Sequence, residues 1–187
     1  VPSNDQDYGF YSHSDSANGV FTHNLSTQTG ANNIVFELHT GATEISYNTL
    51  DAGVYGADTI FFMTYGGADV TTLQNVTANT FDMGTGVGPF DYAHRATGVS
   101  FNSPGAAWGL GDAKWTSILI SNNAFVNIRD NRRGVGFWNS NPAVHNIIGP
   151  QVIGNTINGA AGPRSVGSFG IDTYGLVDNL NATCNTI

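Results

Sequence analysis

The stretch "VTANTFDMG", residues 76–84, is too polar for a fully buried strand and too regular for a loop. Similar stretches recur as "EISYNTLDA" (44–52), "LISNNAFVN" (119–127), "VIGNTINGA" (152–160) and "NATCNTI" (181–187). When they are aligned, one asparagine of each coincides: Asn48, Asn79, Asn123, Asn155 and Asn185, at spacings of 31, 44, 32 and 30 residues. Self-similarity at a nearly constant spacing is typical of a repeat architecture.

The residues around each shared asparagine also repeat. Three positions before it are Ile45, Val76, Ile120, Val152 and Ala182, and two positions after it are Leu50, Phe81, Phe125, Ile157 and Ile187. We predict that these flanking residues point inward and that the residue between, usually Thr, points outward. Asn tolerates left-handed backbone angles, so we predict a structural role for it at the bend, with its side-chain amides stacked from repeat to repeat.

A second recurring stretch precedes each of the first. It reads "IVFELHTG" (34–41), "TIFFMTYGG" (59–67), "ATGVSFNS" (96–103), "RGVGFWNS" (133–140) and "SFGIDTYG" (168–175). Each is typical of a short strand that enters a turn, and no helical pattern lies between the strands. Strands of successive repeats must stack to bury their apolar faces, which predicts a parallel β-helix of five to six coils.

The predicted domain organisation follows from these repeats. We expect an all-β solenoid with little or no helix and a single domain over residues 1–187. Residues 34–187 form the regular coils. The stretch 1–33 contains "YGFYSHSD" and "NGVFTHNLS", which fit a degenerate first coil with Ser26 at an inward position.

Composition excludes several classes of function. The net charge of −8 and the pI near 4.7 argue against nucleic acid as a partner, since phosphate binding needs a basic surface. No apolar run has the length of a membrane span. The single cysteine, Cys184, excludes an internal disulfide and a cysteine-based zinc site, and we predict that it is a small buried filler.

The two ends of the sequence favour a larger assembly. The chain starts with Val1-Pro2 instead of Met, and it stops at Ile187 on an inward-facing position of the repeat. We therefore expect a processed or excised piece, with self-association or continuation of the β-helix at open ends. Unprotected strand edges would otherwise promote aggregation.

The stretches "ISYNTLDA", "VTANTFDM" and "ILISNNAF" resemble the right-handed parallel β-helix repeat of the pectin-lyase-like superfamily. The resemblance covers about residues 34–187 and implies a right-handed solenoid. This superfamily includes polysaccharide lyases, glycoside hydrolases, uronate epimerases, phage tailspikes, adhesins and surface-layer proteins. The function must therefore be argued from a site.

A cluster of basic residues indicates one candidate site. Five of the six Lys and Arg residues lie between positions 95 and 133: Arg95, Lys114, Arg129, Arg132 and Arg133. They fall near two insertions, "DMGTGVGPFDYAHRA" (82–96) and "NSPGAAWGLGDAKW" (102–115). In an acidic chain such a patch would suit an acidic glycan. The alternative is that "RDNRR" is a solvated turn and "DYAHR" a loop with internally paired charges.

If the protein is an enzyme, the resemblance implies that an Arg or Lys removes the proton beside a uronate carboxyl group. The candidate catalytic residues are then Arg95, Arg132, Asp91, His94 and Asp130. No stretch matches a lyase or epimerase signature closely enough to assign a role to any of them.

The remaining candidates concern ligand binding and metals. Trp108 and Trp115 flank a Gly-rich insertion, where they stack on sugar rings together with Lys114, Arg129 and Arg133, or pin the insertion to the barrel wall. Trp138 lies in a strand and is expected to pack. We predict no cofactor and no metal-binding residue. Calcium has only thin support from "NDQD" (4–7) and "YGGADV" (65–70). The histidines are scattered and fit structural or surface roles.

Two hypotheses about function follow. The first is an extracellular or cell-surface module that is structural or adhesive, binds a glycan and stacks with itself or with further β-helix. The second is a polysaccharide lyase or epimerase that acts on an acidic polysaccharide.

Overall fold

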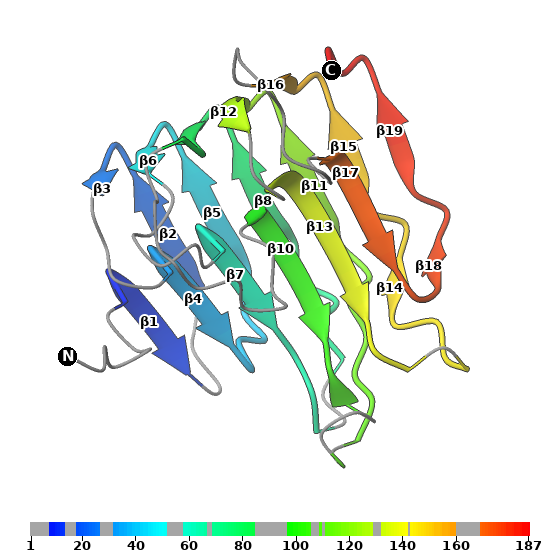
Figure 1. Cartoon of the computed structure of the whole chain (residues 1–187). Helices are drawn as coiled ribbons and strands as arrows, with labels where there is room; N and C mark the ends of the chain where they lie inside the picture. The colour runs from blue at the N-terminus through cyan, green and yellow to red at the C-terminus, as the bar shows by residue number, and fades with distance from the viewer. Residues whose placement is uncertain are drawn as a thin grey trace, which may run out of the picture.

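The computed structural model is an all-β protein of stacked parallel strands (Figure 1). It describes residues 8–13, 18–26, 32–51, 58–66, 69–84, 97–105, 109, 111–128, 132–141, 143–159 and 169–187. None of these residues belongs to an α-helix, and all strand pairings between them are parallel. The all-β fold class predicted from the sequence is confirmed.

Three parallel sheets run along the molecule. Sheet A contains β1 (Phe10–His13), β4 (Ile34–Glu37), β7 (Ile60–Met63), β10 (Thr97–Ser103), β13 (Arg133–Asn139) and β17 (Phe169–Tyr174). Sheet B contains β2 (Gly19–Thr22), β5 (Thr43–Ser46), β8 (Gln74–Thr77), β11 (Ile118–Ser121), β15 (Gln151–Ile153) and β19 (Asn181–Thr183). Sheet C contains β3 (Leu25–Ser26), β6 (Thr49–Asp51), β9 (Thr80–Asp82), β12 (Ala124–Ile128) and β16 (Thr156–Gly159). A small sheet D pairs β14 (Ile147–Ile148) with β18 (Val177–Asp178).

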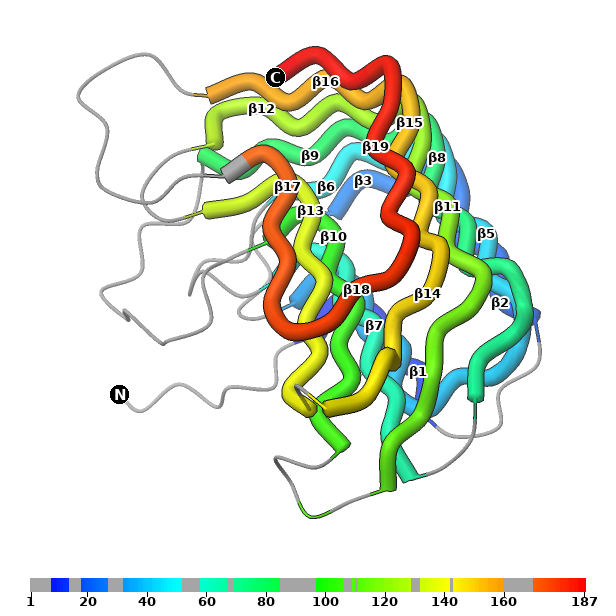
Figure 2. The backbone as a smooth tube through the Cα atoms, turned by 90° about the vertical axis from the view of Figure 1, so that its right-hand side faces the viewer, coloured from blue at the N-terminus to red at the C-terminus, as the bar shows by residue number. Residues whose placement is uncertain are grey.

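Each coil visits sheet A, then sheet B, then sheet C before the chain returns to sheet A. Neighbours within a sheet are therefore equivalent strands of consecutive coils. The last coil faces the viewer in Figure 2, where the chain turns counter-clockwise through β17, β18 and β19 as it advances toward the viewer, so the β-helix is right-handed. Sheets A and B each have six strands, which gives six coils. This agrees with the predicted parallel β-helix of five to six coils.

The shared asparagines form a continuous hydrogen-bonded ladder at the corner between sheets B and C. The side-chain amide of Asn79 donates to Oδ1 of Asn123 at 3.0 Å, and that of Asn123 donates to Oδ1 of Asn155 at 3.0 Å. Each Oδ1 also accepts the main-chain N–H of the asparagine one coil earlier, as Asn123 does from Asn79 at 2.9 Å. The predicted stacking of amides is confirmed, and the ladder runs from Asn24 through to Asn185.

The conformation at the corner differs from the prediction. The left-handed residue is the one before each asparagine, with φ near 55° at Tyr47 (56°), Ala78 (54°), Asn122 (54°) and Cys184 (56°), and 67° at Gly154. The asparagine itself has no positive φ. The residue before each asparagine makes the bend, and the asparagine side chain forms the hydrogen bonds to the next coil.

The flanking apolar residues of the first four repeats fill the core as predicted, whereas Ala182 and Ile187 of the last repeat are exposed. The buried set includes Ile45, Leu50, Val76, Phe81, Ile120, Phe125, Val152 and Ile157. Aromatic rings stack from coil to coil: the ring centroids of Phe62 and Phe101 are 4.4 Å apart, and those of Phe81 and Phe125 are 4.6 Å apart. The nearly parallel planes follow from the register, which places identical residues one strand spacing apart.

The terminal coils are less buried than the middle ones. In the first coil, β1, β2 and β3 pair with β4, β5 and β6, while Val20 and Leu25 are each 73% exposed. In the last coil Ile187 is 77% exposed. Cys184 is also exposed, so the prediction of a small buried filler is wrong. It occupies the left-handed position of the corner, where side chains point away from the core. End-to-end association stays a prediction.

Candidate functional site

The outward side of sheet A carries the chemically diverse residues of this β-helix. Two files of residues run across its strands in register. The first file is Tyr11, Val35, Phe61, Ser100, Gly136 and Asp172, and the second is His13, Glu37, Met63, Asn102, Trp138 and Tyr174. No residue type repeats within either file, whereas the corner between sheets B and C repeats asparagine.

Toward the last coils this side holds an aromatic surface, which we call the Trp138 platform: Arg133, Gly136, Trp138, Asp172 and Tyr174. The guanidinium carbon of Arg133 lies 4.4 Å from the centroid of the Trp138 ring, and its Nε forms an ion pair with Asp172. The Arg133 side chain is 2% exposed, so the indole packs over a buried cation that is already neutralised by a carboxylate.

Gly136 lets the indole lie close to the sheet. A Cβ at this position would be 2.9 Å from Nε1 of Trp138 and 3.1 Å from Cγ2 of Thr97. Next to the indole, the ring of Tyr174 has its centroid 5.8 Å away at an interplanar angle of 36°. Tyr174 is 60% exposed and Trp138 is partly exposed. The two rings therefore present an apolar surface that is held in place from below.

Toward the first coils the same side holds a second group, the Glu37 cluster: Tyr8, Tyr11, His13, Glu37 and Tyr65. The hydroxyl of Tyr11 donates to Oε2 of Glu37, and the hydroxyl of Tyr65 donates to Oε1. Nε2 of His13 lies 3.8 Å from the same Oε1. The rings of Tyr8 and Tyr11 are stacked, with centroids 5.2 Å apart and an interplanar angle of 15°.

Burial and the carboxylate of Glu37 together raise the pKa of both phenols. Burial, followed by the hydrogen bond to Glu37, raises the pKa of Tyr11. The hydrogen bond to Glu37, followed by burial, raises the pKa of Tyr65 to about 12. Ionisation of either phenol would place a second negative charge beside the carboxylate. Both groups are therefore hydrogen-bond donors throughout the physiological pH range.

The two groups are separated by a largely buried stretch of the same face. Between them Met63 is 6% and Ser100 is 0% exposed, and Phe61 and Asn102 are partly buried. The Trp138 platform and the Glu37 cluster are therefore treated as two sites.

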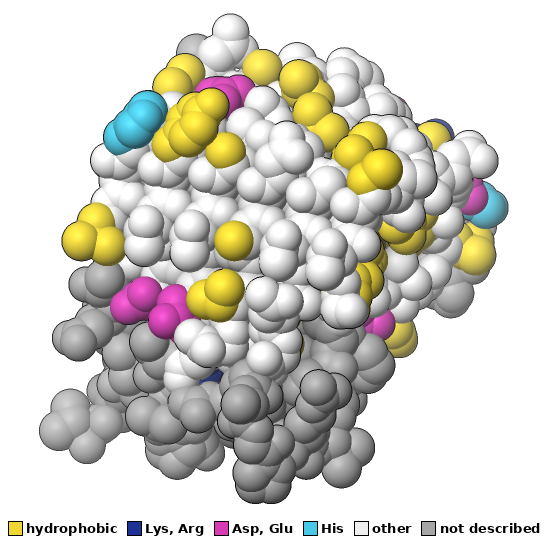
Figure 3. Space-filling model, turned by 90° about the horizontal axis from the view of Figure 1, so that it is seen from above, with side chains coloured by type: hydrophobic (Ala, Val, Ile, Leu, Met, Phe, Trp, Pro, Cys, Tyr) yellow, Lys and Arg dark blue, Asp and Glu magenta, His cyan; other side chains and the backbone are white. Residues whose placement is uncertain are grey.

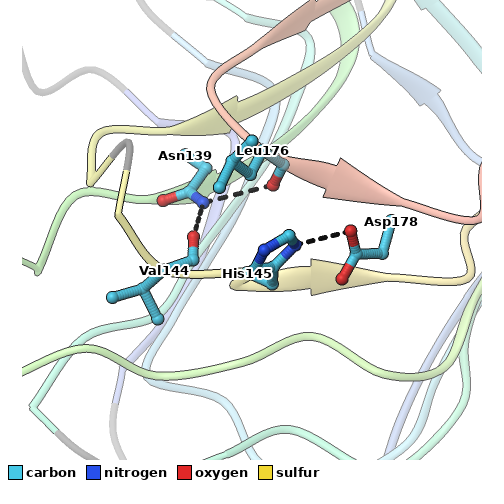
Figure 4. A network of polar contacts seen from close by, with 5 residues as sticks. All are labelled: Asn139, Val144, His145, Leu176 and Asp178. Carbon is cyan, nitrogen blue, oxygen red and sulfur yellow. Dashed lines mark hydrogen bonds and ion pairs between the residues drawn. The ribbon is translucent and has the colours of Figure 1, made fainter.

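A polar network fixes the connections between sheets A and B in the last coils (Figure 4). The side-chain amide of Asn139 donates to the carbonyl oxygens of Val144 and Leu176, which belong to consecutive coils. Nδ1 of His145 lies 2.5 Å from Oδ1 of Asp178, again across two coils. These contacts anchor the turn that follows Tyr174 and so support the platform.

The sequence-predicted basic patch is not a continuous positive surface in the part of the chain that the structure describes. Arg132 is 6% exposed and its Nη1 donates to the carbonyl oxygen of Met83. Arg133 is paired with Asp172, and only Lys114 is exposed. Arg95, Asp91, His94, Asp130, Arg129 and Trp108 lie outside the described residues.

The structure describes two of the three tryptophans, Trp115 and Trp138. Trp115 is fully buried and contacts Phe62 and Phe101 edge-on, and its Nε1 donates to the carbonyl oxygen of Asn102. This location corresponds to the packing interpretation, not to sugar stacking. Trp138 was expected to pack in a strand, and it does lie in β13, but on the outward side.

Sequence reasoning missed Tyr11, Glu37, Tyr65 and Tyr174. A signal was present, because three of them fall on the same outward side of a predicted sheet. Alignment of the repeats detects positions where the coils agree, and it therefore misses these positions, where the coils differ.

The described residues contain no group of three or more His, Cys, Asp or Glu side chains that could hold a metal ion. Of the two calcium-friendly stretches, residues 4–7 and 67–68 lie outside the described part. A search of the described residues found no helix long and apolar enough to cross a membrane.

Comparison with models of known protein families, with curated proteins and with solved structures found no match to this chain.

Proposed function

We propose that this protein is a non-catalytic module of the extracellular or cell-surface space that binds a glycan on the Trp138 platform. We further propose that its β-helix is related to the pectin-lyase-like superfamily, on the repeat stretches around Asn48, Asn79 and Asn123. The observation that carries the proposed function is the pair of accessible rings, Trp138 and Tyr174, on a rigid parallel sheet.

The platform suits a sugar ring for a physical reason. The C–H face of a pyranose is apolar and packs against an aromatic ring, while its hydroxyl groups remain hydrated or bind polar neighbours. Arg133 and Asp172 hold the indole in one orientation, so little conformational freedom is lost on binding. A strand of a parallel sheet positions such a ring more rigidly than a loop would.

The chemistry of the described basic residues favours binding over lyase activity. A lyase base must reach the substrate, but Arg132 and Arg133 are buried and engaged with Met83 and Asp172. Cleavage by a set that includes Arg95, His94 and Asp130 stays a separate prediction.

The test is affinity electrophoresis of the full chain in gels that contain single neutral, acidic or amino polysaccharides. We expect Trp138→Ala and Tyr174→Ala to weaken binding at least about fivefold each, since a stacked aromatic contact contributes roughly 1 kcal/mol beyond its area. Tyr47→Ala is the matched control, because Tyr47 and Tyr174 are each 60% exposed and Tyr47 lies at the corner between sheets B and C.

Three outcomes would overturn the proposal. The first is wild-type protein that binds none of the polysaccharides. The second is an equal loss of binding in Tyr47→Ala and Tyr174→Ala, which would indicate nonspecific adhesion. The third is chain shortening of a polyuronate by the wild-type protein, which would favour the enzyme hypothesis.

A further inference from the structure

We propose that the Glu37 cluster is a second carbohydrate site, which takes a sugar unit that carries no carboxylate. This inference shares with the proposed function only the premise that the ligand is a glycan. It concerns different residues, at the opposite end of sheet A from the Trp138 platform.

The cluster combines an apolar surface with a fixed hydrogen-bond acceptor. The stacked rings of Tyr8 and Tyr11 form one aromatic surface, and Tyr11 is 44% exposed. Directly beside it, the carboxylate of Glu37 is held by the hydroxyls of Tyr11 and Tyr65. A sugar that packs on the rings therefore brings its hydroxyl groups next to the carboxylate.

The carboxylate keeps capacity for such hydroxyl groups. An ionised carboxylate offers about four lone-pair positions, and the two phenols use one on each oxygen. The side chain of Glu37 is 17% exposed, so the carboxylate is partly shielded but not enclosed. A hydroxyl group that donates to an ionised acceptor makes a stronger hydrogen bond than one between neutral groups.

The Glu37 cluster contains more side chains than are needed to connect two neighbouring strands. A single phenol would link β1 to β4, but Tyr11 from β1 and Tyr65 from the segment after β7 meet on one carboxylate between them. His13 approaches the same Oε1 at 3.8 Å with its side chain 46% exposed. Groups from three consecutive coils thus converge on one point of the outer surface.

The negative charge of Glu37 determines which class of sugar the Glu37 cluster can bind. Glu37 would repel a uronate carboxylate, and the whole chain carries a net charge of −8. Arg133 lies three strands away along sheet A and is already paired with Asp172. This reverses, for this site, the preference for acidic glycans that the basic residues suggested in the sequence.

The experiment uses the imidazole signals of the full-length chain in proton NMR as local reporters. His13 lies beside Glu37 and is assigned by comparison with His13→Gln, while His145 and His23 report on other parts of the surface. The probes are the methyl glycosides of glucose, galactose and mannose and, for each, the matched glycoside whose C6 is oxidised to a carboxylate.

We expect saturable shifts of the His13 signals with at least one neutral glycoside and at least about tenfold weaker binding of its uronate counterpart. Glu37→Gln should weaken binding of the neutral glycoside about fivefold and reduce the discrimination. Glu44→Gln is the matched control, because Glu44 is also an outward glutamate that accepts a side-chain hydrogen bond, from Asn75. Tyr11→Phe, which keeps the ring, serves as the second variant if Glu37→Gln does not fold.

Each contrary result is distinct from a failure of the proposed function. His13 signals that do not move with any probe, or that move equally with a uronate, would overturn this inference. So would a Glu37→Gln variant with unchanged affinity. If the Trp138 variants lose polysaccharide binding while His13 does not respond, only this inference fails. If His13 responds but no variant of the platform changes polysaccharide binding, only the platform proposal fails.

Discussion

Two sides of the same solenoid follow opposite rules. At the corner between sheets B and C every coil repeats one asparagine. The outward side of sheet C next to it carries Thr49, Thr80, Thr156 and Thr186 in one file, with Ala124 between Thr80 and Thr156. Figure 3, which looks onto the molecule from above, shows this side as mainly uncharged polar surface with scattered apolar groups. On the outward side of sheet A, each coil carries a different residue, and rings and charges gather there.

The positions that repeat from coil to coil and the positions that differ have different roles. Repetition is required wherever a side chain must pair with its own equivalent one coil away, as in the asparagine ladder. No such requirement acts on the outward side of sheet A, so Glu37 and Trp138 are free to differ from their neighbours.

The largest effect on the free energy of unfolding is expected on the inward side of sheet A. Phe101 stacks on Phe62 and meets Trp115, all fully buried, so Phe101→Ala should lower the free energy of unfolding by about 3–5 kcal/mol. On the outward side of the same sheet, Tyr174→Ala should change it by less than about 0.5 kcal/mol. Urea denaturation of both variants measures the difference. Similar losses in the two variants would contradict the assignment of inward and outward sides.

The asparagine ladder should come next. Asn123→Ala removes the side-chain hydrogen bonds to the carbonyl oxygen of Val76 and to Oδ1 of Asn155, and it leaves the main-chain N–H of Asn79 without its acceptor. We expect a loss of about 3 kcal/mol in the free energy of unfolding, because each lost hydrogen bond contributes about 1 kcal/mol and a buried unpaired group costs more. Asn185→Ala, in the partly buried last rung, should cost less. An equal cost at both positions would indicate local packing effects instead of a continuous ladder.

Gly136→Ala sharpens the role of the Trp138 platform without removing a ring. The added Cβ would crowd Nε1 of Trp138, so the indole must move and glycan affinity should fall several-fold to about tenfold. Ser100→Ala is the control, because Ser100 is the register neighbour of Gly136 in the buried part of the same file. Affinity electrophoresis compares the two variants. Unchanged binding by Gly136→Ala would mean that glycan binding does not depend on the orientation of the Trp138 indole.

The smallest effect concerns pH. His39 is 1% exposed and packs against Phe36, and burial lowers its pKa below the ordinary value of about 6.5. The unfolded chain then binds a proton at a higher pH than the folded one, so the free energy of unfolding should fall as the pH decreases below about 6.5. His39→Phe should reduce this dependence. Denaturation curves recorded between about pH 7.5 and 5.5 measure this dependence. An identical change of the free energy of unfolding with pH in wild type and His39→Phe would contradict the prediction.

The sequence predicted the corner well and the outward side of sheet A poorly. The ladder from Asn48 to Asn185 follows from alignment because each rung must match the next. By contrast, the basic patch around Arg132 and Arg133 is divided among a main-chain carbonyl, an ion pair and an indole. Met83 and Asp172 come from other coils, at distances along the chain that spacing alone does not reveal.

The repeats in the sequence predict a solenoid of five to six coils and most of its inward residues, because each coil must match the coil on which it stacks. Three features are visible only in the tertiary structure: Trp115 lies in the core, Cys184 is exposed, and the hydroxyls of Tyr11 and Tyr65 donate to Glu37. Their positions depend on which residues of different coils lie side by side on one face. The loops that connect sheets vary in length, so that register is fixed by packing and not by spacing in the sequence.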